Sequence, residues 1–166
     1  MTISFDIQAE AGDVYRVILS SGDDAFFADE DIRAILGDAV EIVEIDLERI
    51  SGTNPTTMTT LRYIAEGIGR CFMQNDKAIL YYYCDELSEV FMSPRHLDLW
   101  PQEYRSHLFS LMFQRYVSTI SNNDITDITI VINQDNRPLF MHLISRTKHA
   151  RYIEILKDYI SQNYGK

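Results

Sequence analysis

The chain has 166 residues, of which 46% are hydrophobic, 11% aromatic and 24% charged, and its formal net charge is −10. A globular chain of this length buries roughly two-thirds of its unfolded surface, enough for a core without disulfides or metals. These figures exclude a disordered chain, a collagen, a coiled coil and a small cysteine-rich scaffold, and they predict one globular domain over residues 1–166.

The first half of the chain predicts mainly strands. Residues 14–19 are rich in β-branched and aromatic side chains, residues 20–24 are typical of a turn, and residues 25–28 resume an apolar run, which together indicate a β-hairpin. Residues 31–37 fit either a short helix ended by glycine or an irregular edge segment. Residues 40–47 alternate as a strand does, although neither face of that strand is clearly polar.

A helix is predicted to begin at Asn54 and Pro55, because Asn is a common N-cap and Pro fits the first helical position. Its apolar side chains recur at helical spacing as far as Met73. Residues 78–84 are then apolar on both faces, which is typical of a central strand.

The second half predicts a loop, two helices and a hairpin. The loop covers residues 87–100, and a helix with a broad apolar face follows over residues 101–120. Residues 128–132 and 139–144 flank a turn, and a last helix covers residues 148–163. The order ββ(β)-α-β-α-ββ-α predicts an α+β fold with a mostly antiparallel sheet and helices packed on it.

Side chains suited to chemistry gather at the end of strand 78–84 and in the loop behind it. The catalytic candidates are Cys84, Asp85, Glu86 and His96, and the candidates for binding a phosphate or carboxylate are Arg95 and Arg105. Two structural interpretations stand beside these: Cys84 as a core residue, and an Asp85–Arg105 ion pair that ties the following helix to the sheet.

The region from residue 90 to residue 117 carries more apolar side chains than one helix can bury. The predicted interface residues are Phe91, Met92, Leu97, Trp100 and Phe113. We therefore expect a homo-oligomer or a subunit of a larger assembly.

Several classes of site and location are not expected. The histidines and acids show no metal-ligand spacing, so no metal and no cofactor is predicted, and His142 is interpreted as a hydrogen-bonded core or interface residue. No stretch reaches the roughly 18 apolar residues of a membrane span, and the first residues do not resemble a signal peptide, which predicts a cytoplasmic protein.

The negative charge is concentrated in the first third of the chain. Residues 1–50 contain 13 acidic and 3 basic side chains and no Lys, whereas residues 51–166 contain 12 of each sign. A surface of this sign repels phosphate backbones, so nucleic-acid binding is not expected. We expect that a partner attracted by this charge is basic and binds residues 1–50.

Four short motifs resemble an uncharacterised family of small bacterial α+β proteins that is common in Bacteroidetes. These motifs are residues 46–50 (DLERI), residues 71–75 (CFMQN), Cys84 with Asp85, and residues 104–109 (YRSHLF). The resemblance spans residues 13–118, with a longer and more apolar segment at 87–103 and a longer entry to the first long helix at 52–57. It implies a bacterial cytoplasmic setting and carries no activity.

The sequence favours a non-enzymatic protein–protein interaction module or subunit. The alternative is a small enzyme or toxin-like factor that acts on a phosphorylated or nucleotide substrate, with Asp85 as acid or base and with Arg95 and Arg105 holding the anion. A pocket that contains these three side chains would favour the enzyme, and a buried Asp85–Arg105 pair would favour the interaction module.

Overall fold

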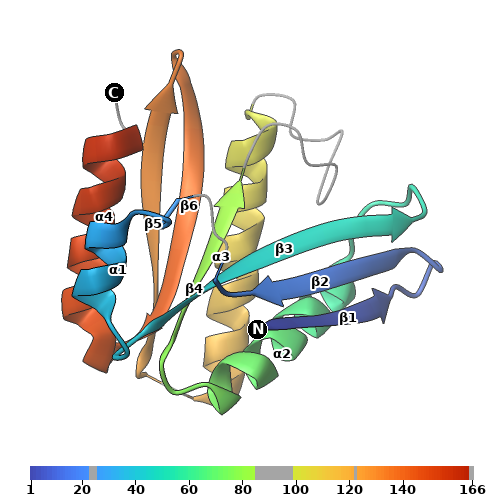
Figure 1. Ribbon diagram of the computed structural model, residues 1–166. Helices are drawn as coiled ribbons and strands as arrows, with labels where there is room; N and C mark the ends of the chain where they lie inside the picture. Colours follow the sequence, from blue (N-terminus) through green and yellow to red (C-terminus); the bar gives the residue numbers. More distant parts are fainter. Residues whose placement is uncertain (23–25, 85–98, 122, 165–166) are drawn as a thin grey trace.

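The computed structural model contains one six-stranded mixed sheet (Figure 1). The structure describes residues 1–22, 26–84, 99–121 and 123–164. In chain order the strands are β1 (Thr2–Gln8), β2 (Val14–Ser20), β3 (Glu41–Ser51), β4 (Ala78–Cys84), β5 (Ile125–Gln134) and β6 (Arg137–Arg146). Their spatial order is β1-β2-β3-β4-β6-β5, and every neighbouring pair is antiparallel except β3–β4. This confirms the predicted α+β class and the mostly antiparallel sheet.

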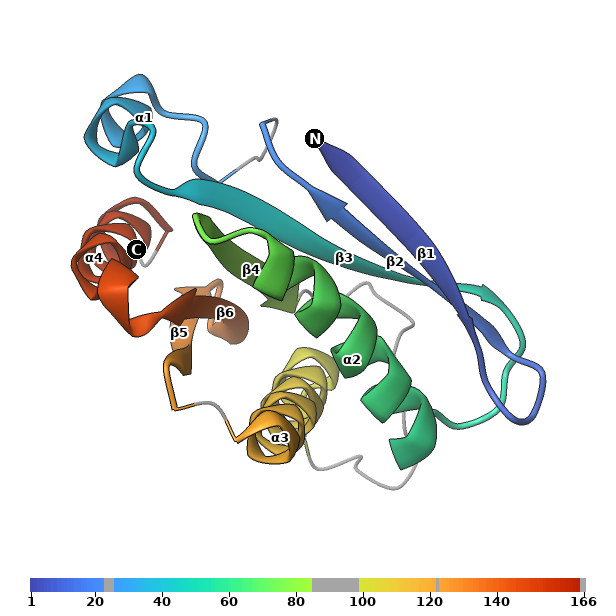
Figure 2. The same ribbon diagram turned by 90° about the horizontal axis from the view of Figure 1, so that it is seen from below.

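Helices lie on both faces of the sheet. They are α1 (Glu30–Leu36), α2 (Met58–Gln74), α3 (Pro101–Ile120) and α4 (Ala150–Tyr164), and a short 3₁₀ turn (Thr147–His149) leads into α4. Figure 2 shows α2 and α3 on one face and α1 and α4 on the other. We call these the α2–α3 face and the α1–α4 face.

Strand β4 is the central strand that its two apolar faces predicted. Leu80 and Tyr82 pack in the core beneath α2 and α3, whereas Ile79 and Tyr81 pack in the second core beneath α1 and α4. The parallel β3–β4 pair follows from the crossover through α2, because parallel neighbours require a long connection.

The predicted start of α2 is wrong by three residues. Thr57 is the N-cap, and its hydroxyl oxygen accepts a hydrogen bond from the Thr60 amide at 3.2 Å. Asn54 instead donates its backbone and side-chain amides to the carboxylate of Asp13. Asn54 and Pro55 therefore precede the helix. The hydrogen bonds from Asn54 to Asp13 hold the loop that leads into α2.

The partner of β2 also differs from the prediction. Strand β2 pairs with β1, which precedes it, and Phe26 and Phe27 lie in no strand but pack against Tyr81. Strand β1 forms because its alternate apolar side chains pack against the α2–α3 core. Of the two interpretations of residues 31–37, the helix is confirmed, with the Asp29 carboxylate as its N-cap.

Candidate functional site

Most of the side chains predicted to carry chemistry or an interface lie outside the described residues. They are Asp85, Glu86, Phe91, Met92, Arg95, His96 and Leu97. The structure describes the other four, Cys84, Trp100, Arg105 and Phe113. The Asp85–Arg105 pair and the anion site therefore stay predictions.

The four described candidates differ in exposure. Cys84 and Arg105 are each only 1% exposed, and Cys84 belongs to the core beneath α2 and α3. Phe113 is partly buried against the same core. Trp100 is 46% exposed, and the Arg137 guanidinium lies 5.9 Å from the centre of its ring. Of these four side chains, only Trp100 presents a large apolar surface to solvent.

A buried polar network lies between α3 and the β5–β6 edge of the sheet. His142, on β6, is fully buried, and its Nε2 lies 2.8 Å from the hydroxyl of Ser106 on α3. Its Nδ1 lies 3.0 Å from both carboxylate oxygens of Asp127 on β5, and Thr129 approaches the same nitrogen at 3.4 Å. We call Ser106, His142, Asp127 and Thr129 the His142 network.

The His142 network has the Ser–His–Asp order of a hydrolytic triad, but it is closed. Ser106 lies in the second turn of α3 and is only 3% exposed, and the Phe109 ring lies 4.8 Å from the His142 ring. A nucleophilic serine needs access to substrate and free donors for an oxyanion, whereas interior helix amides already bond within the helix. The network therefore satisfies a buried imidazole and docks α3 on the sheet.

The sequence interpretation of His142 as a hydrogen-bonded buried residue agrees with this geometry. Its partners could not be read from the sequence, because Ser106 and Asp127 come from two other elements. One feature of the sequence could have indicated these contacts. Ser106 and Ser110 lie one turn apart on α3, and in the structure both face the edge of the sheet.

The face of strands β1–β3 that points away from α2 and α3 is polar, and no helix among the described residues covers it (Figure 2). Strand pairing places Arg16 between Asp6 and Glu48, Ile18 between Ser4 and Asp46, and Ser20 beside Glu44. The four acidic side chains of this surface, which we call the acidic sheet face, are Asp6, Glu44, Asp46 and Glu48. Only Arg16 carries a positive charge among these strand residues.

Arg16 is held by the carboxylates on either side of it. Its Nε and Nη2 donate to the two oxygens of Asp6 at 2.8 and 3.0 Å, so the arginine lowers the pKa of Asp6. The hydrogen bonds that Arg16 donates to Asp6, together with the negative charges of Asp6 and Glu48, raise the pKa of Arg16. A shallow hollow of about 470 Å³ lies over this corner and reaches Ser4 and Ile18. The other three acidic side chains of this face, Glu44, Asp46 and Glu48, all belong to β3.

One acid of the first third has a different role. Asp13 is only 3% exposed, and its carboxylate accepts hydrogen bonds from Arg49 at 2.8 Å and from both amide groups of Asn54. Gly52 lies so close that a Cβ there would stand 2.1 Å from an Asp13 oxygen. Asp13 thus anchors the loop between β3 and α2 and is not available to a partner.

No protein family, curated protein or solved structure matches the chain. Among the described residues, no group of three or more His, Cys, Asp or Glu side chains is arranged to hold a metal ion. No helix in the described part of the chain is long and apolar enough to cross a membrane.

Proposed function

We propose that this protein is a non-enzymatic binding module, and that the acidic sheet face is the surface on which it docks a basic protein segment. The observation that supports the proposal is that the two halves of the α1–α4 face of the sheet differ. Helices α1 and α4 pack on its β4–β6–β5 half, whereas its β1–β3 half presents carboxylates that no described helix covers. Complementary charge steers such a partner and sets its register.

The spacing of the carboxylates suggests the form of the partner. Glu44, Asp46 and Glu48 occupy alternate positions of β3, so they point to the same side and repeat about every 7 Å along the strand. An extended segment repeats its own side chains at the same interval. We therefore propose a segment in which Lys or Arg occupies every second position.

The non-enzymatic part of the proposal is supported by the closed His142 network and by the burial of Cys84 and Arg105. The setting we propose is the bacterial cytoplasm, following the family resemblance. Self-association through the apolar region that contains Trp100 stays a separate prediction.

The test is an NMR titration of the ¹⁵N-labelled chain with a short synthetic peptide in which Lys alternates with Thr. We expect amide shifts confined to β1–β3, and a Kd that rises steeply as added NaCl shortens the Debye length from about 10 Å towards 3 Å. The variant that combines Glu44→Gln, Asp46→Asn and Glu48→Gln removes the charges with little change of shape. Its Kd should be at least about tenfold weaker, because attraction by several charges is lost.

The matched control removes three charges elsewhere, with Glu103→Gln, Glu154→Gln and Asp158→Asn on the helices. This variant has the same net charge as the first, so its Kd should stay within about twofold of the original chain if the site is local. Equal weakening by both variants would reduce the interaction to net charge and remove the proposed surface. Unfolding midpoints of both variants verify that each remains folded.

A further inference from the structure

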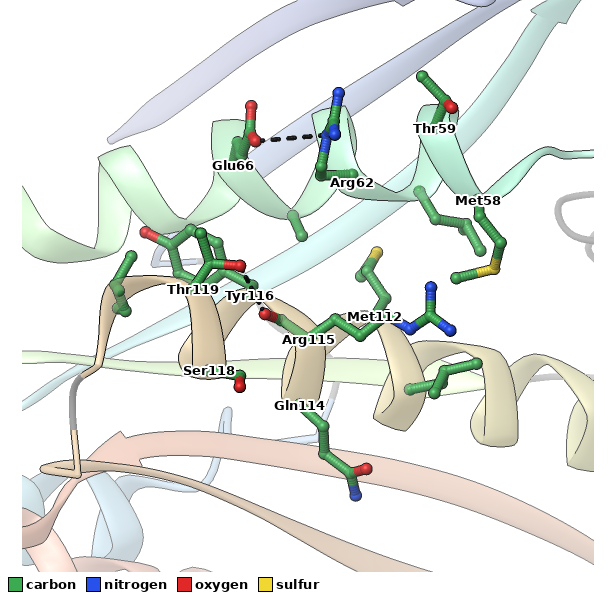
Figure 3. A pocket seen from close by; sticks show the side chains of 14 residues that line it. Met58, Thr59, Arg62, Glu66, Met112, Gln114, Arg115, Tyr116, Ser118 and Thr119 are labelled. Carbon is green, nitrogen blue, oxygen red and sulfur yellow. Dashed lines mark hydrogen bonds and ion pairs between the residues drawn. The ribbon is translucent and has the colours of Figure 1, made fainter.

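A groove of about 880 Å³ runs between α2 and α3 on the opposite side of the molecule from the acidic sheet face (Figure 3). Its floor includes the buried side chains of Leu61, Ala65 and Met112. Its rim carries apolar side chains that are more than a third exposed, namely Met58, Leu111 and Ile120. A concave surface with an apolar floor and an apolar rim is unusual for a surface that meets only water.

The charge of this groove is opposite to that of the chain as a whole. On the α2 rim, Arg62 Nε lies 3.7 Å from a carboxylate oxygen of Glu66, so this pair is neutral overall (Figure 3). On the α3 side, Arg115 is exposed, and within the described part of the chain its guanidinium makes no ion pair and no side-chain hydrogen bond. One uncompensated positive charge thus lies at an apolar groove of a protein with net charge −10.

The groove also has a small inward extension. A void of about 30 Å³, without polar surface, lies between the two helices and the sheet, and it shares Ala65, Met112 and Tyr116 with the groove. Tyr116 lies close enough to α2 that a Cβ at Gly69 would stand 2.2 Å from its hydroxyl oxygen, so the helices touch at this end. The void has room for part of one apolar side chain, the kind of anchor that dominates many interfaces.

From these features we infer that the α2–α3 groove is a second docking surface, and that its occupant is an amphipathic helix with an acidic side chain placed to meet Arg115. Two helices side by side form a natural seat for the apolar stripe of a third helix. The arginine then provides a bidentate partner for a carboxylate, which fixes the direction and register of the bound helix. This surface is independent of the acidic sheet face, because it binds a partner of opposite charge on different elements.

The methionines allow a direct test with ¹³C-methyl-methionine NMR on the full chain. The probe is a synthetic amphipathic peptide with Leu on one face and Glu beside it, and the comparison peptide carries Lys in place of Glu. Binding should shift the methyl signals of Met58 and Met112, which line the groove, and leave those of Met1 and Met73 in place. Arg115→Gln should weaken the Kd about tenfold, since a charge-assisted hydrogen bond is lost.

Two further variants test the location. Leu111→Glu places a like charge on the groove rim and should abolish binding of the acidic peptide, whereas Arg151→Gln on α4 should leave the Kd within about twofold. Equal binding of the lysine peptide, or shifts of equal size at Met1 and Met73, would overturn the inference. Binding of decanoate without binding of the peptide would also overturn it, because the groove would then be a site for a small amphiphile.

Discussion

The two halves of the α1–α4 face of the sheet show how one continuous surface becomes both core and exterior. A single row of paired residues crosses it from Ser20 and Glu44 to Tyr81, Leu143 and Ile128. On the β1–β3 half the row is polar, and on the β4–β6–β5 half it is apolar and packed beneath α1 and α4. Strand positions on this face are therefore apolar where a helix covers them and polar where none of the described helices does.

The polar groups of the molecule divide in a similar way. The hydrogen-bonding atoms of the His142 network bond to one another beneath α3, and Asp13 is surrounded by Arg49 and Asn54. The carboxylates of Asp46 and Glu48 instead lie on exposed side chains. Buried polar groups of the first kind support the fold, whereas exposed charges of the second kind cost little to desolvate when another molecule approaches them.

The largest effect is expected from the covered half of the face. Leu143→Ala should lower the free energy of unfolding by roughly 4 kcal/mol, because Leu143 is fully buried and its truncation leaves a cavity. Ile18→Ala on the open half should cost less than about 1 kcal/mol, since this side chain is already partly in water. Urea unfolding of both variants measures the contrast, and equal losses would show that the open half is covered.

The next comparison is between a buried and an exposed acid of the first third of the chain. Asp13→Asn should cost roughly 3 kcal/mol, because Arg49 keeps its charge in a site that is mostly closed to water. Asp46→Asn on the acidic sheet face should cost less than about 1 kcal/mol. Thermal unfolding at one pH is sufficient to measure both, and the two variants have the same net charge.

A smaller effect is expected within the His142 network. Ser106→Ala should cost roughly 1.5 kcal/mol, because Nε2 of a fully buried His142 loses its partner. Thr129→Ala, which removes a contact of 3.4 Å to a nitrogen already held by Asp127, should cost clearly less. Unchanged stability in Ser106→Ala, measured by urea unfolding, would contradict the helix-docking role assigned to the network.

The smallest effect concerns Glu41, which lies at the start of β3. Hydrogen bonds from Ser21 and Asn75 hold the pKa of this carboxyl below its ordinary value of 4.5. A lowered folded-state pKa means that the carboxylate favours the folded chain at pH values above 4.5, and that this stability is lost as the pH falls through the lower folded value. In Glu41→Gln, this contribution to the pH dependence of the free energy of unfolding should disappear. We expect a difference of about a few tenths of a kcal/mol from the original chain, measured by urea unfolding across that pH range.

Much of the local structure was predictable from the sequence. Helix α3 covers the predicted residues 101–120, and β4 covers the predicted residues 78–84. Both depend on patterns that act over a few residues, namely a proline at the helix start and an apolar run of strand length. The site was less predictable, because the acidic sheet face and the α2–α3 groove arise from elements that are distant along the chain.

By itself, the sequence determined the class of fold, the central strand and the concentration of negative charge in residues 1–50. It could not determine which side of β3 faces the solvent, because that strand has no clearly polar face until the positions of the helices are known. The orientation of β3 follows from the tertiary structure, because α2 packs on one face of the strand and Asp46 and Glu48 lie on the other. The tertiary structure also decided the partners of His142 and Asp13, since those contacts join residues that no local pattern relates.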